Sequence, residues 1–228
     1  MKEILQNSLK LCMITLISGL LLGVVFEVTK EPREKQQEKS KQEAYAKVFA
    51  DAESFEELDY DKKAMEDYLA QNGYRPTVAY IDGVVAAKDK AGTVIGYVIT
   101  VTDKEGYGGE IRFTIGIQND GTINGISFLS ISETAGVGMK AADKKFRSQF
   151  EGKKAVIFEY TKNGAVSDNQ IDAISGATIT TNAVTNGVNA GVLAYQFVSG
   201  TGIEDIGKSY IPVSEENKAE GKEGGTDE

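Results

Sequence analysis

The residues best suited to chemistry in this chain lie in one short stretch, Asp172–Thr180, which reads Asp-Ala-Ile-Ser-Gly-Ala-Thr-Ile-Thr. Gly176 and Ala177 would let a ligand come close to the backbone, because neither carries a bulky side chain. Thr178 places a hydroxyl at the same point, close to the hydroxyl of Ser175. The stretch therefore has the composition of a site for a small anionic ligand.

A helix is predicted directly after this stretch. Apolar residues recur there at spacings of four and three, namely Val184, Val188, Val192 and Tyr195, and Gly200 stands where a helix stop is expected. The start of a helix has unpaired N–H groups and the positive end of the helix dipole, and both favour a phosphate. The alternative is a Thr-capped helix start without a ligand, but a cap needs one hydroxyl and this stretch has several.

A second glycine-containing segment, Glu133–Lys140, lies between a predicted strand and a predicted helix at residues 140–150. Its glycines, Gly136 and Gly138, match the relaxed dinucleotide-binding pattern, and Glu159 falls where an acid for the ribose would stand. That pattern requires a βαβ unit, whereas the strand before this segment belongs to an antiparallel hairpin. We therefore reject the nucleotide interpretation.

Five segments have the pattern of β-strands: Val78–Ala87, Thr93–Thr102, Glu110–Gln118, Thr122–Ser130 and Ala155–Tyr160. Asn119-Asp120-Gly121 is a strong hairpin turn between two of them. Consecutive hairpins indicate an antiparallel sheet with one covered face. Helices near residues 45–70, 140–150 and 180–198 would cover it, with 51–69 as short acid-rich helical pieces. The predicted class is α+β.

The segment Leu9–Val28 is nearly all apolar, and about 20 residues are enough for a helix to span a bilayer. A cleaved signal peptide is the alternative, but the run ends without the small residues that cleavage requires. Cys12 lies at the start of the run, which argues against a lipoprotein. We therefore expect an uncleaved single-pass anchor in the cell membrane, with residues 1–8 in the cytoplasm.

The rest of the chain is expected outside the cytoplasm in three parts. Residues 29–43 are rich in Lys, Glu and Gln and predict a solvent-facing stalk. Residues 44–200 would form the folded domain. Residues 201–228 are predicted to be a disordered acidic tail, because the last fifteen carry six acids and two Lys and have no aliphatic residue beyond Ala.

The composition excludes several kinds of site. The chain has no His and no Trp, and its single Cys is Cys12, so the domain has no ligands for ordinary zinc, iron–sulfur or haem sites and no resident metal is expected. Ser–His and Cys–His nucleophile pairs are excluded too. The net charge of −9 argues against a nucleic-acid partner. Redox work by this chain would therefore require an organic cofactor.

The stretch Asp172–Thr180 resembles the Asp-x-x-Ser-Gly-Ala-Thr-x-Thr flavinylation sequence, in which the Thr of Ser-Gly-Ala-Thr holds FMN through a phosphoester bond. Glu133–Gly138 resembles the Glu-Thr-Pro-Gly-Leu-Gly loop of the G subunit of the Rnf complex, the ion-translocating ferredoxin:NAD oxidoreductase. It departs from that loop at Ala135 and Val137, where Pro and Leu are expected. Gly106-Tyr107-Gly108-Gly109 fits the same family, to which the C subunit of the sodium-translocating NADH:quinone reductase is related.

The resemblance implies covalent FMN on Thr178, added outside the cytoplasm by a flavin transferase, and an FMN-binding domain over residues 44–200. The chain would be a non-catalytic electron-carrying subunit. Its partners would be the other membrane subunits of a complex that couples ferredoxin:NAD electron transfer to Na⁺ or H⁺ transport.

On the same resemblance, we assign roles to the remaining residues. Asp172 would bind a metal or orient Thr178 during attachment. The phosphate turn would be Ser175, Gly176 and Ala177, and the residues near the ring or ribityl chain would be Glu133, Thr134, Gly136 and Gly138. Lys140 would lie near the pyrimidine edge, where positive charge stabilises an anionic reduced flavin, or would be a solvated Lys at a helix start.

Two other functions stay open at this point. One is a flavin-bearing electron shuttle that serves a different extracytoplasmic reductase. The other is a flavin-free scaffold domain on a stalk, which a colourless purified protein would favour.

Overall fold

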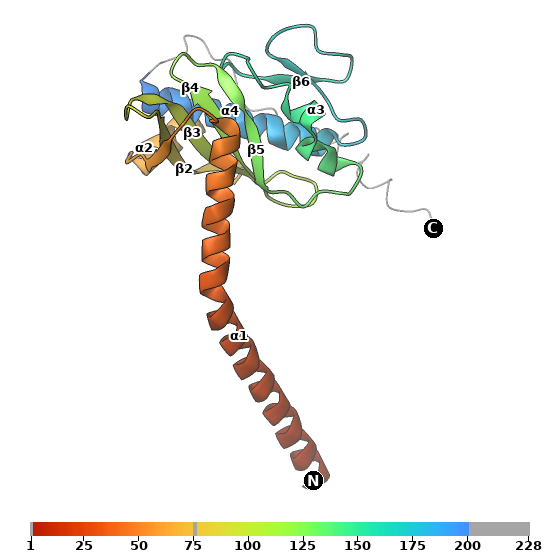
Figure 1. The fold of residues 1–228 in the computed structure, drawn as a ribbon. Helices are drawn as coiled ribbons and strands as arrows, with labels where there is room; N and C mark the ends of the chain where they lie inside the picture. The colour runs from red at the N-terminus through yellow and green to blue at the C-terminus, as the bar shows by residue number, and fades with distance from the viewer. Residues whose placement is uncertain (1, 75–76, 201–228) are drawn as a thin grey trace. The chain divides into compact units, whose positions relative to one another are not determined.

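A computed structural model describes residues 2–74 and 77–200 of the chain (Figure 1). It divides into two compact units, one formed by residues 1–43 and the other beginning at Ala44. Each unit is described by itself.

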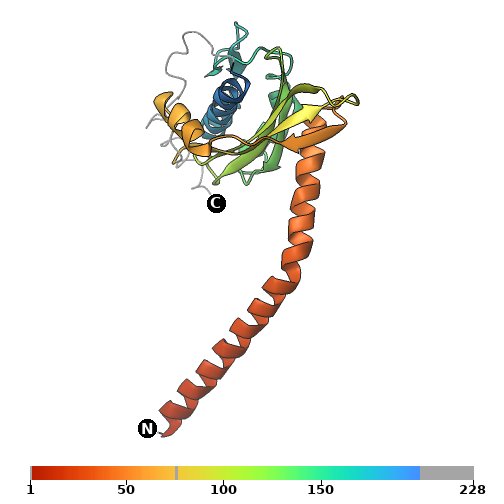
Figure 2. The same cartoon turned by 90° about the vertical axis from the view of Figure 1, so that its left-hand side faces the viewer.

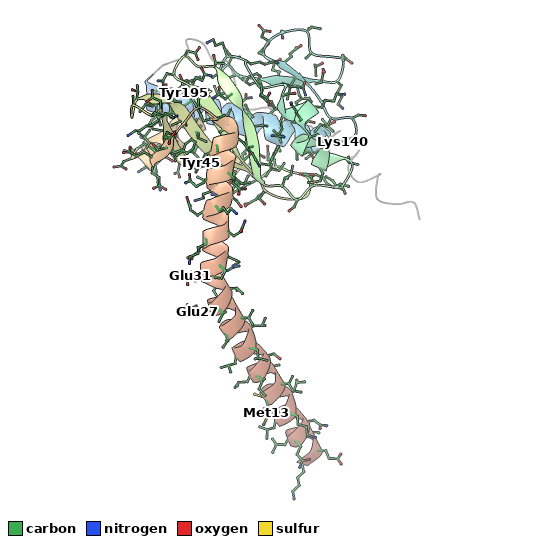
Figure 3. The ribbon with its side chains drawn as sticks, in the orientation of Figure 1. Met13, Glu27, Glu31, Tyr45, Lys140 and Tyr195 are labelled. Atoms are coloured by element: carbon green, nitrogen blue, oxygen red, sulfur yellow. The ribbon has the colours of Figure 1, made fainter. Side chains whose placement is uncertain are left out.

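The first unit consists of most of one long helix, α1 (Lys2–Val48), which continues through Pro32. The apolar side chains of its first half, among them Met13, are exposed along its length (Figure 3). Charged pairs one turn apart follow, such as Lys35 with Glu31 at 2.7 Å. By length and composition, α1 is able to cross a membrane.

The second unit contains a five-stranded antiparallel sheet in the order β1-β2-β3-β4-β5. Its strands are β1 (Ser54–Glu57), β2 (Ala79–Lys88), β3 (Val94–Asp103), β4 (Ile111–Gln118) and β5 (Ile123–Ser130). The last four are the strands that the sequence predicts, because alternating apolar and β-branched residues identify them. The α+β class is confirmed.

Several local predictions are wrong. The expected helical pieces at 51–69 contain strand β1 and only then α2 (Lys62–Gln71), which Asp61 caps through a hydrogen bond from the Ala64 N–H at 3.0 Å. Strand β1 forms because it pairs with β2 at the sheet edge, which its own acid-rich sequence does not signal.

The expected strand Ala155–Tyr160 is reduced to β6 (Glu159–Thr161), which pairs in parallel with β7 (Gln170–Asp172). Before β6, the Asn189 side chain bonds the N–H and the carbonyl of Phe158, at 2.8 and 2.9 Å. A side-chain amide therefore takes the place of a neighbouring strand at Phe158.

Helix α4 (Thr178–Ser199) packs against one face of the sheet and is buried over most of its length. Gly187 and Gly191 allow close approach, because a Cβ there would lie 2.8 Å from the side chains of Phe113 and Ile115 respectively. Tyr195, labelled in Figure 3, donates from its hydroxyl to the Asn119 carbonyl at 3.1 Å. The predicted helix at 180–198 is thus confirmed, whereas that at 140–150 is two short pieces, η1 (Gly138–Ala142) and α3 (Lys144–Arg147).

The opposite face of the sheet is also partly covered, which corrects the expectation of one covered face. Tyr45, Val48 and Phe49 form a separate apolar cluster there with residues of β2 and β3. Gly96 and Gly116 make room for it, since a Cβ on Gly116 would lie 2.8 Å from Cβ of Val48. Figure 2 shows α4 and the end of α1 on opposite sides of the sheet.

Candidate functional site

The turn before α4 takes its shape from the helix that follows it. The Ala177 N–H donates to the Ile174 carbonyl at 2.9 Å, and Gly176 has a φ of 74°. The Thr181 hydroxyl accepts from the Ile174 N–H at 3.0 Å and donates to the Ala177 carbonyl at 2.9 Å. This turn is therefore held in place from its buried side.

No side chain caps the start of α4 among the described residues. Ala177 occupies the cap position and makes no side-chain hydrogen bond. The first N–H that pairs within the helix is that of Thr181, with the Ala177 carbonyl. The N–H groups of Thr178, Ile179 and Thr180 have no backbone partner among the described residues, and Ser175 and Gly176 in the preceding turn are exposed. The simple Thr-capped helix start is therefore wrong, and the donors of the first turn are available to an anion.

Thr178 is the first residue of α4 and is 9 % exposed. Within the described ranges its hydroxyl makes no hydrogen bond to protein. The Thr178 oxygen is thus partly shielded from solvent and free of hydrogen bonds to the described residues. It lies at the uncapped start of α4.

The second predicted segment forms a tight loop between β5 and η1. The Thr134 carbonyl accepts from the N–H groups of Val137 and Met139, at 3.2 and 3.1 Å. Strand β5 is an edge strand, paired antiparallel with β4, so the loop does not belong to a βαβ unit. Gly136 has a φ of 74°, and a Cβ on it would meet no atom within 4 Å.

The two segments, far apart in sequence, come together at Gly138. A Cβ on this glycine would lie 2.7 Å from both Glu133 Oε2 and Thr180 Oγ1. A Cβ on Gly176 would lie 3.9 Å from Val137 Cγ1. The loop therefore packs directly on the turn and first helical turn that carry Thr178.

Glu133 lies beneath this junction and is only 9 % exposed. Its Oε1 accepts from the Gly108 N–H at 3.3 Å, whereas its buried Oε2 has no partner among the described residues. The side chain thus joins the turn at residues 106–109 to the loop at 133–138. The uncapped helix start and the open turn at Gly176 fit a phosphate group, whereas the orphaned Glu133 oxygen is an acceptor and would fit a hydrogen-bond donor elsewhere on such a ligand.

Asp172 and Lys140 are the remaining predicted residues. The Asp172 carboxylate accepts from the Ala165 N–H at 2.6 Å and holds the loop at 162–168. Lys140 is exposed on η1 (Figure 3). In the part of the chain that the structure describes, no three acids, His or Cys gather as metal ligands.

Sequence reasoning missed Asp103, at the end of β3 where the turn at 106–109 begins. The residue is fully buried; its Oδ1 accepts from the Glu105 N–H at 2.8 Å, and its Oδ2 has no partner among the described residues. Burial raises the pKa of this carboxyl well above its ordinary value. No local pattern marks it, because the side chain becomes buried only when α4 packs on the sheet.

The family model for the FMN-binding domain matches residues 106–192, from the turn at 106–109 through most of α4. The G subunit of the Na(+)-translocating ferredoxin:NAD(+) oxidoreductase complex of Acetobacterium woodii is 31 % identical over 87 % of this chain and 94 % of that protein. The G subunit of the proton-translocating ferredoxin:NAD(+) oxidoreductase complex of Clostridium ljungdahlii is 32 % identical over 77 % of this chain and 83 % of that protein.

A solved structure shares the fold. It is the C subunit of the Na(+)-translocating NADH-quinone reductase from Parabacteroides distasonis, with a TM-score of 0.50 and 19 % identity, covering 75 % of this chain and 96 % of that one.

Proposed function

Because the chain belongs to the family of G subunits of ion-translocating ferredoxin:NAD oxidoreductase complexes and carries an FMN-binding domain, we propose that it holds FMN covalently through the Thr178 hydroxyl. The observation that carries the proposal is the uncapped start of α4, where the free hydroxyl of Thr178 stands beside unpaired N–H groups. A phosphoester there would accept hydrogen bonds from those groups and lie at the positive end of the helix dipole.

Attachment requires a transferase that uses FAD. The Thr178 oxygen would attack the phosphorus of the FMN half, the pyrophosphate bond would break, AMP would leave, and the hydroxyl proton would be released. Ser175 and Gly176 leave this side of the turn open to the transferase, because both are exposed. Thr181 keeps the turn in shape through its bonds to Ile174 and Ala177.

Bound FMN would supply reversible electron transfer, which no side chain of the domain offers, since the domain has neither His nor Cys. The role of the protein would be to bind the flavin and to orient it. The loop at Glu133–Gly138 packs on the first turn of α4 and would form one side of the ring pocket. Helix α1 would anchor the protein beside its membrane partners, with the domain outside the cytoplasm.

The test is the intact mass and visible spectrum of the full-length protein, purified from membranes that also contain the transferase. The wild-type chain should carry one FMN that survives denaturation, and Thr178→Ala should carry none. Thr180→Ala is the matched control, because Thr180 lies on the same helical turn but its hydroxyl faces Gly138.

Thr178→Ser should still be flavinylated, since it keeps an oxygen at the same place. Covalent flavin on Thr178→Ala, or its loss from Thr180→Ala alone, would contradict the assignment. A colourless wild-type protein would favour a flavin-free scaffold.

A further inference from the structure

Positive charge gathers in one segment of the second unit, directly after the loop at Glu133–Gly138. Residues 140–154 contain six Lys or Arg and two acids, although the net charge of the whole chain is −9. The segment forms η1, α3 and the stretch that follows α3. Such a local excess of one sign of charge attracts partners of the opposite sign.

Three of these six basic side chains are engaged within the protein. Arg147 and Lys153 donate to backbone carbonyl groups, and Lys154 pairs with the Asp120 carboxylate at 3.0 Å. These contacts hold the segment against the rest of the domain, so their positive groups already have partners.

The other three basic side chains form what we call the basic surface, which consists of Lys140, Lys144 and Lys145. All three are exposed, and none has an ion pair among the described residues. They belong to η1 and to α3, which begins directly after it (Figure 3 labels Lys140). Their charge is therefore available to an anionic partner.

A comparable pair of exposed lysines stands at the start of α2, where Lys62 and Lys63 also lack an ion pair among the described residues. Four acids lie within four residues of that pair in the sequence, namely Asp59, Asp61, Glu66 and Asp67. Within the same distance of Lys144 and Lys145 there is one acid, Asp143. An acidic partner would therefore prefer the basic surface to the start of α2.

The chain itself supplies an acidic segment, residues 201–228, which lies outside the described residues. It carries eight acids and three Lys. A segment of that length spans about 90 Å when extended. A domain of this size has a radius of gyration of about 15 Å, so the segment is long enough to reach any part of its surface. Attachment to the same chain also raises its effective concentration at that surface.

We propose that the acidic segment 201–228 binds in cis to the basic surface of Lys140, Lys144 and Lys145. Bound there, it neutralises positive charge beside the loop at Glu133–Gly138, which packs on the turn before Thr178. The basic surface is then closed to acidic proteins and to anionic lipid headgroups until salt or a stronger anion displaces the segment. The inference does not depend on the proposed flavin.

Carbodiimide cross-linking of the full-length protein in mild detergent tests the contact. The reagent activates a carboxylate, which a lysine amine in contact with it then attacks, so that an amide forms and the reagent leaves as its urea. Peptide masses from the monomeric product identify the joined residues. We expect links from 201–228 to Lys144 and Lys145 that fall several-fold at high salt, because the screening length shrinks from about 30 Å at 0.01 M to about 3 Å at 1 M.

A binding measurement removes the dependence on cross-linking chemistry. The probe is a fluorescent decaglutamate peptide at low salt, and the variant replaces the six carboxylates of the last fifteen residues with amides. The variant should bind decaglutamate several-fold more tightly than wild type, because its basic surface is no longer occupied. The six substitutions are Glu215→Gln, Glu216→Gln, Glu220→Gln, Glu223→Gln, Asp227→Asn and Glu228→Gln.

Two matched pairs of lysine substitutions locate the gain in affinity. Added to the amide variant, Lys144→Gln with Lys145→Gln should abolish the gain, whereas Lys62→Gln with Lys63→Gln should leave it in place. Both pairs remove two adjacent exposed charges from the start of a helix, so only their position differs.

Three results would overturn the inference. One is a set of cross-links that spreads equally over Lys62, Lys63 and the basic surface, or that joins two chains. Another is an affinity for decaglutamate that the amide variant leaves unchanged. The third is equal binding of wild type and the amide variant to vesicles that contain phosphatidylglycerol, with loss of that binding in Lys144→Gln with Lys145→Gln, which would assign the basic surface to the membrane.

Discussion

The hydroxyl of Thr181 accepts a hydrogen bond from the backbone N–H of Ile174 at 3.0 Å, across the turn that precedes α4. Thr181→Val keeps the shape of the side chain but loses this bond and the one to the Ala177 carbonyl. We expect a loss of about 1–3 kcal/mol in the free energy of unfolding, because the Ile174 N–H becomes unsatisfied. Flavin attachment should also slow, since the turn no longer has a fixed shape.

Thr185→Val is the control for this change. The Thr185 hydroxyl donates to the Thr181 carbonyl at 2.7 Å, which is a bond within α4 that does not touch the turn. Denaturant unfolding and the rate of flavinylation should separate the two variants. An equal rate of attachment in both would show that the turn does not need Thr181.

Gly138→Ala should damage the junction between the loop and α4. The added methyl would lie 2.7 Å from Thr180 Oγ1 and 2.9 Å from Glu133 Cβ, so neighbouring atoms must move. We expect about 1–3 kcal/mol of destabilisation together with a changed flavin spectrum. Gly83→Ala is the control, because a Cβ on Gly83 meets nothing within 4 Å. A spectrum that Gly138→Ala leaves unchanged would place the ring elsewhere.

Asp103 should make the protein less stable as the pH rises. Its folded-state pKa is raised by burial, so its contribution is fully present below the ordinary value of 3.8 and is lost as pH rises through the folded pKa. Asp103→Asn removes the ionisation. The stability of this variant relative to wild type should therefore increase from about pH 4 upward, by at most about 1.4 kcal/mol per pH unit.

The stability of Asp120→Asn relative to wild type should not change with pH above about pH 5. Hydrogen bonds from Lys154 and Thr122 lower the pKa of this exposed carboxyl to about 2, so it is charged in both the folded and the unfolded state across that range. Denaturant unfolding of the full-length protein in mild detergent, repeated at several pH values, checks both variants. Parallel pH profiles for Asp103→Asn and wild type would contradict the assignment of a raised pKa.

Helix α1 should hold the protein in the membrane through its apolar first half. Ile17→Arg places a charge near the centre of the predicted span, which costs about 2.5–3.5 kcal/mol on insertion scales. We expect this variant to be lost from the membrane fraction, whereas Gln37→Arg in the stalk should remain. Sequencing of the mature N-terminus checks that Leu9–Val28 is retained, and protease access to intact cells checks the outward orientation. A mature chain that begins after Val28 would rule out the anchor.

The sequence alone was sufficient to predict the helices and strands in which apolar residues recur at a regular spacing. The alternation in Glu110–Gln118 and its neighbours determined strands β2 to β5, because side chains in a strand point to opposite faces in turn. The spacing of Val184, Val188 and Val192 determined α4 for the corresponding reason. The sequence also placed Ser175–Thr178 at the start of that helix, which the structure confirms.

Tertiary contacts decided the features that no regular spacing of residues in the sequence could indicate. Strand β1 exists because β2 offers it an edge, and Phe158 is held by the side chain of Asn189 from α4. The buried contacts of Glu133 depend on two turns that are distant in sequence from each other and from α4. Local sequence determines which residues share a helix or strand face. Which faces and turns meet depends on packing between distant segments, and this packing brings the loop at Glu133–Gly138 to Thr178.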